Sequence, residues 1–180
     1  MLGKWGTIKV TIGGLIGVLG ILFLILALSG STLNVKNSIS FDIADEIGAE
    51  VEFSGTNSSE EITNMPEKLL IKPTETQQSR SIVIPNQKFK SINSEIVYVF
   101  RVKNTSEKKS FTATASIANI SPDLESKISA SVSYSKVGSD SFENANTLSV
   151  GETTEIKITF VLLDDTSSFD YEPNITIEIK

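Results

Sequence analysis

The sequence predicts an all-β domain, built as an antiparallel sandwich of two sheets and preceded by one N-terminal apolar helix. An uncharged apolar run of bilayer length stands near the N-terminus, and beyond it apolar and polar residues alternate with the period of a strand rather than that of a helix. The chain has 180 residues, and removing the N-terminal run leaves roughly 150, enough for one domain with one core.

The apolar run covers residues 10–28 (VTIGGLIGVLGILFLILAL) and contains no charge. At about 1.5 Å per helical residue it spans roughly 29 Å, which matches the hydrocarbon layer of a bilayer. Lys4 and Lys9 precede the run, and no acidic residue occurs before Asp42. The positive-inside rule therefore predicts that residues 1–9 are cytoplasmic and that the rest of the chain is exported.

Two fates of the run stay open. The length of the run favours a retained transmembrane anchor, and the membrane is then a partner that residues 10–28 contact. Alternatively, Ala27-Leu28-Ser29 has the small residues that signal peptidase recognises, and the run is then cleaved off. The protein is thus expected either in the cell membrane with an extracellular C-terminal domain, or secreted to the cell surface after cleavage near Ser29. A short linker, residues 29–32, leads into a domain predicted over residues 33–180.

Alternation of apolar and polar residues predicts the strands of this domain. In the first, residues 33–43, one face carries Leu33, Val35, Ile39, Phe41 and Ile43. Six further segments alternate strongly, namely 47–53, 96–102, 111–117, 128–134, 156–162 and 175–179, and three do so weakly, namely 68–72, 81–85 and 147–150. Amphipathic strands in this number predict two antiparallel sheets with apolar inner faces and wet outer faces.

The connections contain little helix. A single turn is expected at 121–125, where Ser121 can cap the turn and Pro122 occupies its first position. Two polar stretches, 54–67 and 73–80, are longer than ordinary hairpin loops. They are interpreted either as recognition loops or as plain connections.

The composition excludes most enzyme classes. The chain has no Cys and no His, which removes disulfides, thiolate nucleophiles, imidazole acid–base catalysis and the usual zinc sites. No G-x-S-x-G, P-loop or dinucleotide motif occurs. The acidic segment 164–170 lacks the spacing and the glycine of a calcium loop and is interpreted as a solvated turn. We expect no enzymatic activity, no cofactor and no metal.

The charge of the exported part argues against nucleic acid as a partner. The whole chain has a net charge of −6 from 16 basic and 22 acidic residues, and without Lys4 and Lys9 the balance of 14 against 22 gives −8. An exported chain can also carry glycans. Candidate acceptor triplets, Asn-x-Ser or Asn-x-Thr, stand at Asn57, Asn104, Asn119 and Asn174.

Four segments carry a family resemblance: LALSGSTLNVKNSISFDI, EIVYVFRVKNTSEKKSFTATASI, EIKITFVLLDD and PNITIEIK. They are similar to the TasA/camelysin-type β-sandwich proteins of Gram-positive bacterial surfaces and to a looser set of anchored bacterial surface proteins. The resemblance implies a jelly-roll-like sandwich, whereas the strand pattern alone also allows an Ig-like one. It further implies extracellular fibres in which one subunit supplies its N-terminal strand to the next.

The sequence offers an independent physical reason for such assembly. Only four residues, 29–32, separate the apolar run from the first strand, so cleavage after Ser29 frees a strand that can add to the open edge of a neighbour. The candidate donor residues are Leu33, Val35, Ile39 and Phe41.

Three functions follow as hypotheses. The first is a non-enzymatic structural protein of the cell surface, a fibre or matrix subunit that self-associates by strand addition. The second is a membrane-anchored binding module that recognises a protein or a glycan through the stretches 54–67 and 73–80. The third is a pilin-like filament subunit with a helical core, which the absence of an acidic residue early in the apolar run disfavours.

Overall fold

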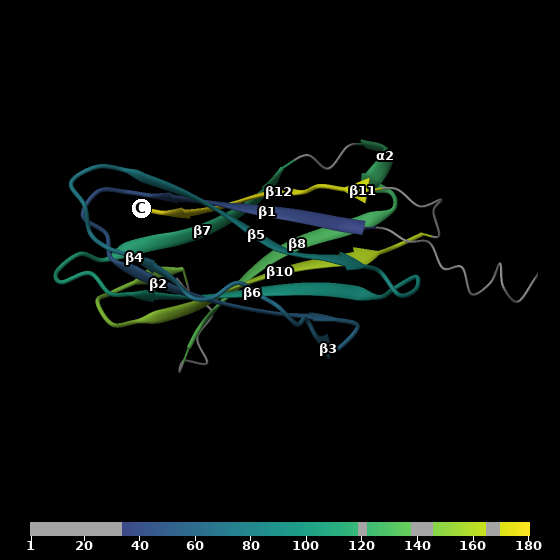
Figure 1. Ribbon diagram of the computed structural model, residues 1–180, viewed down its shortest axis with the longest axis horizontal. Helices are drawn as coiled ribbons and strands as arrows, with labels where there is room; N and C mark the ends of the chain where they lie inside the picture. Colours follow the sequence, from purple (N-terminus) through teal and green to yellow (C-terminus); the bar gives the residue numbers. More distant parts are fainter. Residues whose placement is uncertain (1–33, 119–121, 138–145, 165–169) are drawn as a thin grey trace, which may run out of the picture.

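The computed structural model describes residues 34–118, 122–137, 146–164 and 170–180, and these form two β-sheets (Figure 1). The first sheet contains β1 (Asn34–Ile43), β5 (Gln78–Lys88), β7 (Phe111–Ala118), β9 (Thr147–Leu148), β11 (Asp170–Tyr171) and β12 (Asn174–Ile179). The second sheet contains β2 (Ala49–Asn57), β3 (Glu60–Glu61), β4 (Leu69–Ile71), β6 (Glu95–Asn104), β8 (Ile128–Lys136) and β10 (Thr153–Leu162). The short helix α2 (Pro122–Glu125) lies between β7 and β8, where a single turn is predicted.

The strand order interleaves the start, middle and end of the chain. In the first sheet the order is β5-β1-β12-β7-β9, with β11 beside the start of β1, and in the second it is β2-β6-β10-β8, with β3 and β4 along the outer edge of β2. All pairings are antiparallel except those of β1 with β11 and β12, which are parallel. The predicted antiparallel two-sheet sandwich is therefore confirmed in most pairings, and only β1 departs from it, through its parallel pairs with β11 and β12. Alternation specifies which face a side chain occupies but not the direction of the neighbouring strand.

The inner faces of the two sheets meet in one apolar core. Phe41 of the first sheet packs edge-on against Phe53 of the second at a centroid distance of 6.1 Å, and Phe160 of the second packs against Tyr171 of the first at 5.9 Å. Alternate residues of β10 from Thr154 to Leu162 are buried. The predicted inward phase of the strong strands is confirmed by this burial.

The two long polar stretches contain more strand than expected. Residues 54–57 complete β2, residues 60–61 form β3, and residues 78–80 begin β5, an eleven-residue strand of which only 81–85 is predicted. Gly55 is one reason why the sequence predicts a loop here, because a glycine in a polar segment is typical of a loop. Here its backbone approaches β6, and a Cβ atom at this position would lie 2.7 Å from the carbonyl oxygen of Val97.

The domain has two distinct ends. Asn34 begins β1 at one end, and the C-terminal Lys180 lies at the other (Figure 1). Within the described ranges, no helix is long and apolar enough to cross a membrane. The predicted cytoplasmic segment 1–9, the anchor 10–28 and the linker 29–32 lie outside those ranges.

Candidate functional site: the slot of the first strand

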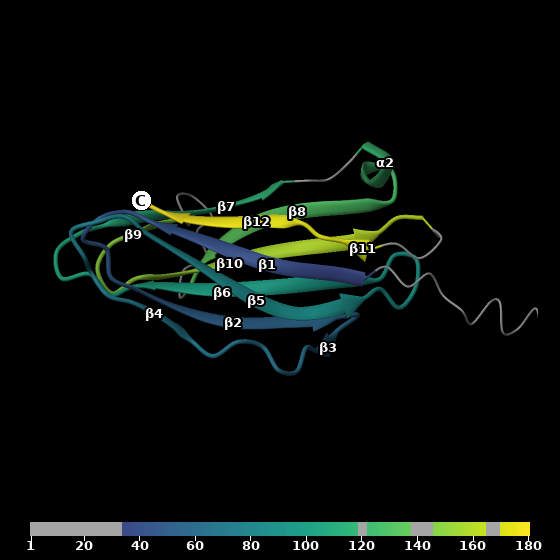
Figure 2. The ribbon, with the colours of Figure 1, turned by 45° about the horizontal axis from the view of Figure 1, so that its top comes forward.

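The first strand occupies an interior position in its own sheet. β1 lies between β5 on one side and β11 and β12 on the other (Figure 2). Ile39, for example, stands opposite Ile82 of β5 and Ile175 of β12. Just beyond the strand, the Ala44 N–H donates to the carbonyl oxygen of Ile179 at 2.8 Å. The backbone of β1 is thus paired along both edges.

The candidate donor residues lie in the core. Val35, Ile39 and Phe41 are all 0% exposed, as is Ile43, while Leu33 falls outside the described residues. Burying one such side chain is worth about 1.5–3 kcal/mol. We call the space that β1 fills between β5 and β12 the slot. A domain whose slot lacked these four side chains would lose several kcal/mol of folding free energy, so a stable domain needs this strand from its own chain or from another copy.

The connection from β1 to β2, residues 44–48, is fastened to the turn after β6. The Gly48 N–H donates to Ser106 Oγ at 3.0 Å, and the Ser106 hydroxyl donates back to the Gly48 carbonyl oxygen at 3.2 Å. Glu46 has a positive φ of 61°, which a non-glycine residue seldom adopts. This connection is the only covalent link from β1 to the following strands, and it carries local strain.

Asn104 holds this turn together. Its side chain is 1% exposed, and its amide group donates to the carbonyl oxygens of Lys109 at 2.9 Å and Leu148 at 3.0 Å. Its Oδ1 accepts the N–H of Ser106 at 2.9 Å. The sequence predicts Asn104 as a possible glycan acceptor, but in the folded domain its side chain is buried and both of its amide hydrogens are bonded, which leaves no room for a glycan.

The other three acceptor triplets differ in accessibility. Asn57 is also buried, and its amide donates to Gln87 Oε1 at 3.1 Å and to the Lys88 carbonyl oxygen at 2.8 Å. Asn174 is exposed at the start of β12, and Asn119 lies outside the described residues. Of the described acceptors, only Asn174 is therefore open to modification in the folded state.

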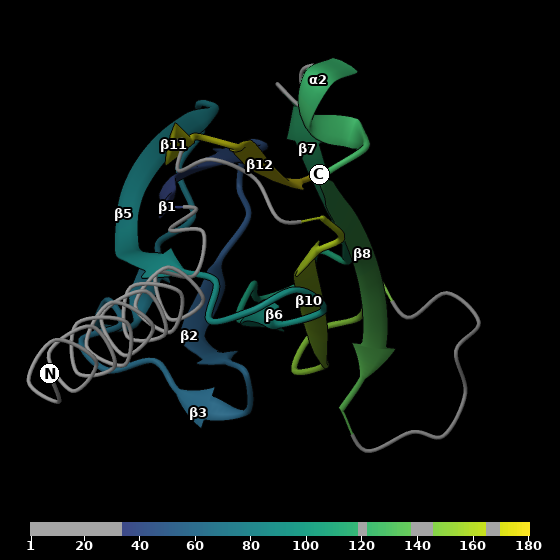
Figure 3. The same ribbon diagram turned by 90° about the vertical axis from the view of Figure 1, so that its right-hand side faces the viewer.

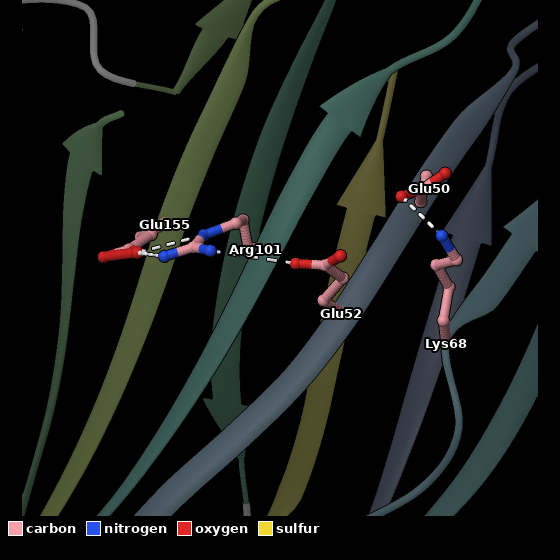
Figure 4. A network of polar contacts seen from close by, with 5 residues as sticks. All are labelled: Glu50, Glu52, Lys68, Arg101 and Glu155. Atoms are coloured by element: carbon pink, nitrogen blue, oxygen red, sulfur yellow. Dashed lines mark hydrogen bonds and ion pairs between the residues drawn. The ribbon is translucent and has the colours of Figure 1, made fainter. Parts of the chain in front are cut away.

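Charged side chains on the outer face of the second sheet form cross-strand pairs (Figure 4). Arg101 of β6 donates to Glu155 of β10 at 2.7 Å and lies 3.8 Å from Glu52 of β2, and Lys68 lies 2.9 Å from Glu50. The hydrogen bond to Glu155 raises the pKa of Arg101, and the hydrogen bond to Glu50 raises that of Lys68. These half-exposed pairs keep the face charged and wet rather than preparing an acid or a base for catalysis.

Within the described ranges, acidic side chains do not cluster as metal ligands. Of the acidic segment 164–170, residues 165–169 lie outside those ranges. At the C-terminal end of the domain, an open groove of about 550 Å³ is lined by Glu46, Pro73, Glu107, Lys108 and Lys109. Its mixed charges suit contact with a polar surface better than enclosure of a substrate.

One polar group beside the slot is buried. Tyr171 of β11 pairs with Val35 through the backbone, and its side chain is 1% exposed. Among the described residues the Tyr171 hydroxyl finds no hydrogen-bond partner, and burial raises its pKa from 10.0 to about 12. The strand that flanks the start of β1 therefore includes a destabilising group.

Comparisons with protein-family models, with curated proteins and with solved structures find no match for this chain. The most distinctive feature of the described domain is its interior first strand, which a single short connection joins to the rest.

Proposed function

We propose that this chain is a non-enzymatic structural protein of the cell surface, a fibre or matrix subunit that assembles by exchanging its first strand between copies. The observation that carries the proposal is the position of β1. It is paired on both edges and fully buried on its inner face, yet it is joined to the following strands only through residues 44–48. The resemblance to TasA/camelysin-type surface proteins points the same way.

Exchange costs little once two copies meet. In the slot of a neighbouring copy, β1 would make the same hydrogen bonds and apolar contacts that it makes in its own domain. The exchanged and unexchanged forms therefore differ mainly in the conformation of residues 44–48. In the exchanged form the strained turn at Glu46 is free to extend. Because each copy can donate one strand and accept one, exchange between two copies alone closes a pair, and exchange passed on from copy to copy produces a linear fibre.

The connections between strands support the jelly-roll-like arrangement as part of this proposal. The chain crosses from one sheet to the other between β1 and β2 and at every step from β4 to β11. Such crossing is typical of jelly rolls, whereas an Ig-like sandwich joins several neighbours within one sheet. The parallel pairing of β1 with β12 departs from the jelly-roll pattern.

The experiment uses the natural absence of cysteine. Ser40 of β1 stands directly opposite Ser81 of β5 on the outer face, so the S40C/S81C variant can form a disulfide across this pair. In the chain lacking residues 1–29, oxidation of a dilute sample should give bonds within one chain. Oxidation after incubation at high concentration should give a ladder of covalent oligomers on a non-reducing gel.

The matched control places the disulfide between two strands that stay together during exchange. Thr176 of β12 stands opposite Ser116 of β7, so the S116C/T176C variant should give only bonds within one chain at every concentration. If S40C/S81C behaves like this control at every concentration, strand exchange does not occur and the proposed mode of assembly is wrong.

A second candidate is a binding module, and the groove at the C-terminal end favours it. The groove is lined partly by Pro73, from the predicted loop 73–80, and by Glu107 and Lys108 of the turn after β6. Reversing both charges in the E107K/K108E variant should then abolish retention on a panel of cell-surface glycans while the oligomer ladder persists. Unchanged retention would remove this candidate.

A further inference from the structure

The two open sides of the domain end in strand edges of different character, and Figure 3, which looks along the strands, shows β5 on one side and β8 on the other. On the β5 side, β3 and β4 are only two and three residues long. β5 itself contains Arg80 and Pro85, and its pairing with β1 shifts register between Val35 and Asn37. Short strands, charge, proline and bulges are the features that protect an edge from pairing with another chain.

The β8 edge has only one of these features, a single charge at its last residue. Its nine residues read ISASVSYSK, with no proline and no charge before Lys136. The strand is regularly paired with β10 over its full length, without a register shift. A long, regular edge that is uncharged over eight of its nine residues is the kind that accepts another strand.

The backbone of β8 presents a row of free hydrogen-bonding groups. The Val137 N–H donates to Thr153, and the Lys127 carbonyl oxygen accepts the N–H of Leu163, so the odd-numbered positions face β10. The groups of the even-numbered positions between residues 128 and 136 then point away from β10. No strand pairs with this edge in the described part of the chain.

The inner face behind this edge is incompletely covered. Ala130, Val132 and Tyr134 of β8 are only partly buried, whereas the inward residues of β10 beside them are fully buried. The Tyr134 hydroxyl reaches across to the first sheet and accepts the Ala115 N–H at 2.8 Å. An added strand would therefore gain apolar contacts as well as backbone hydrogen bonds.

We propose that β8 pairs with β8 of a second copy in antiparallel orientation, centred on Val132, and joins the two second sheets into one. In this register Val132 faces its own copy, Ala130 faces Tyr134, and Ile128 faces Lys136. Serines face serines on the outer face, and no two like charges are opposed. The pairing supplies about ten backbone hydrogen bonds, and its two-fold symmetry lets one patch serve both partners.

The antiparallel orientation has a consequence for anchored copies. β8 and β1 both run along the long axis of the domain (Figure 2). An antiparallel pair would therefore place its two Asn34 ends at opposite ends. Copies held by their N-termini in one membrane cannot adopt this arrangement together. Anchored copies would therefore pair across two facing surfaces, and only released or detergent-solubilised copies are free to pair in solution.

The test uses the full chain in detergent micelles, where both orientations are accessible. The single cysteine of Val132→Cys would face its counterpart at about 5.5 Å between Cα atoms, within disulfide reach. After oxidation most of this variant should run as a covalent dimer on a non-reducing gel. Val83→Cys, on the 75% exposed position of the opposite edge strand, is the control and should remain largely monomeric.

Added charges provide the second arm. In the Val132→Cys background, the exposed pair S131K/S133K sets lysines opposite lysines and should lower the dimer yield at least tenfold. The exposed pair S79K/S81K on β5 adds the same charge and should leave the yield unchanged. Light scattering of S131K/S133K without the cysteine, compared with the unmodified chain, checks the result independently of cysteine. Equal dimer yields from Val132→Cys and Val83→Cys, or a dimer yield that S131K/S133K leaves unchanged, would overturn the proposal. The proposal is also wrong if a different partner occupies this edge, because the Val132→Cys dimer would then not form.

Discussion

Replacing Tyr171 with phenylalanine should stabilise the domain, because the substitution removes a buried hydroxyl to which no residue in the described part of the chain offers a hydrogen bond. The ring itself contributes to the core and packs edge-on against Phe160, and this contact remains in the variant. A buried polar group without a partner costs about 1–3 kcal/mol. We expect the free energy of unfolding at pH 7 to rise by about 1–2 kcal/mol, since some relaxation around the hydroxyl offsets part of that cost.

The same substitution should change the dependence of stability on pH. Burial raises the pKa of Tyr171 from 10.0 to about 12, so between these values the unfolded chain has lost a proton that the folded domain retains. The free energy of unfolding therefore falls as the pH rises through this window, and the contribution is fully present only below pH 10. At pH 11 the loss is roughly 1.4 kcal/mol. The advantage of Tyr171→Phe should grow by that amount between pH 9 and pH 11.

Urea titrations of the full chain in detergent, followed by far-ultraviolet circular dichroism at pH 7, 9 and 11, measure both effects. Tyr134→Phe is the matched control, because its hydroxyl accepts the Ala115 N–H, and its removal should lower the free energy of unfolding by about 1 kcal/mol. If Tyr171→Phe is less stable than the unmodified chain at pH 7, its hydroxyl has a partner and the reasoning is refuted.

Three further substitutions test the fold in the same urea titration. Phe41→Ala should lower the free energy of unfolding by about 3–5 kcal/mol, because it empties the centre of the slot, and a loss below about 1 kcal/mol would contradict the burial of β1. Gly55→Ala should cost about 1–3 kcal/mol through its clash with the Val97 carbonyl oxygen, and a neutral result would contradict that close approach. Arg101→Gln should change stability by at most about 1 kcal/mol, with a difference that shrinks in high salt, and a larger effect would show that its ion pairs are not simple surface pairs.

Much of the local structure was predictable because it follows from periodicity. Ile156, Ile158 and Phe160 alternate with polar residues, and all three are buried in β10 as this pattern predicts. The turn at α2 was predictable from Pro122. β3, with only two residues, and the parts of β5 outside 81–85 were missed, because a short segment has no period and β5 carries exposed polar residues on an edge.

The parts of the candidate site that could not be predicted depend on contacts between residues that are far apart in the sequence. The alternating face of β1 identifies Phe41 as a core residue, but nothing local shows that the last strand lies beside it in parallel. Gly48 and Ser106, which fasten the connection after β1, are 58 residues apart. The burial of Asn104 likewise depends on the strand pairing around it, and the acceptor triplet carries no such information.

The sequence by itself determined the class of this domain, the inward phase of its main strands and the absence of thiol and imidazole chemistry, because each follows from composition or from neighbours along the chain. Only the tertiary structure decided that β1 is an interior strand and β5 a protected edge strand, and that no other described strand pairs with the outer edge of β8. Whether a strand is central or at an edge depends on which distant segments hydrogen-bond to its two sides, and the alternation of its own side chains is the same in both positions.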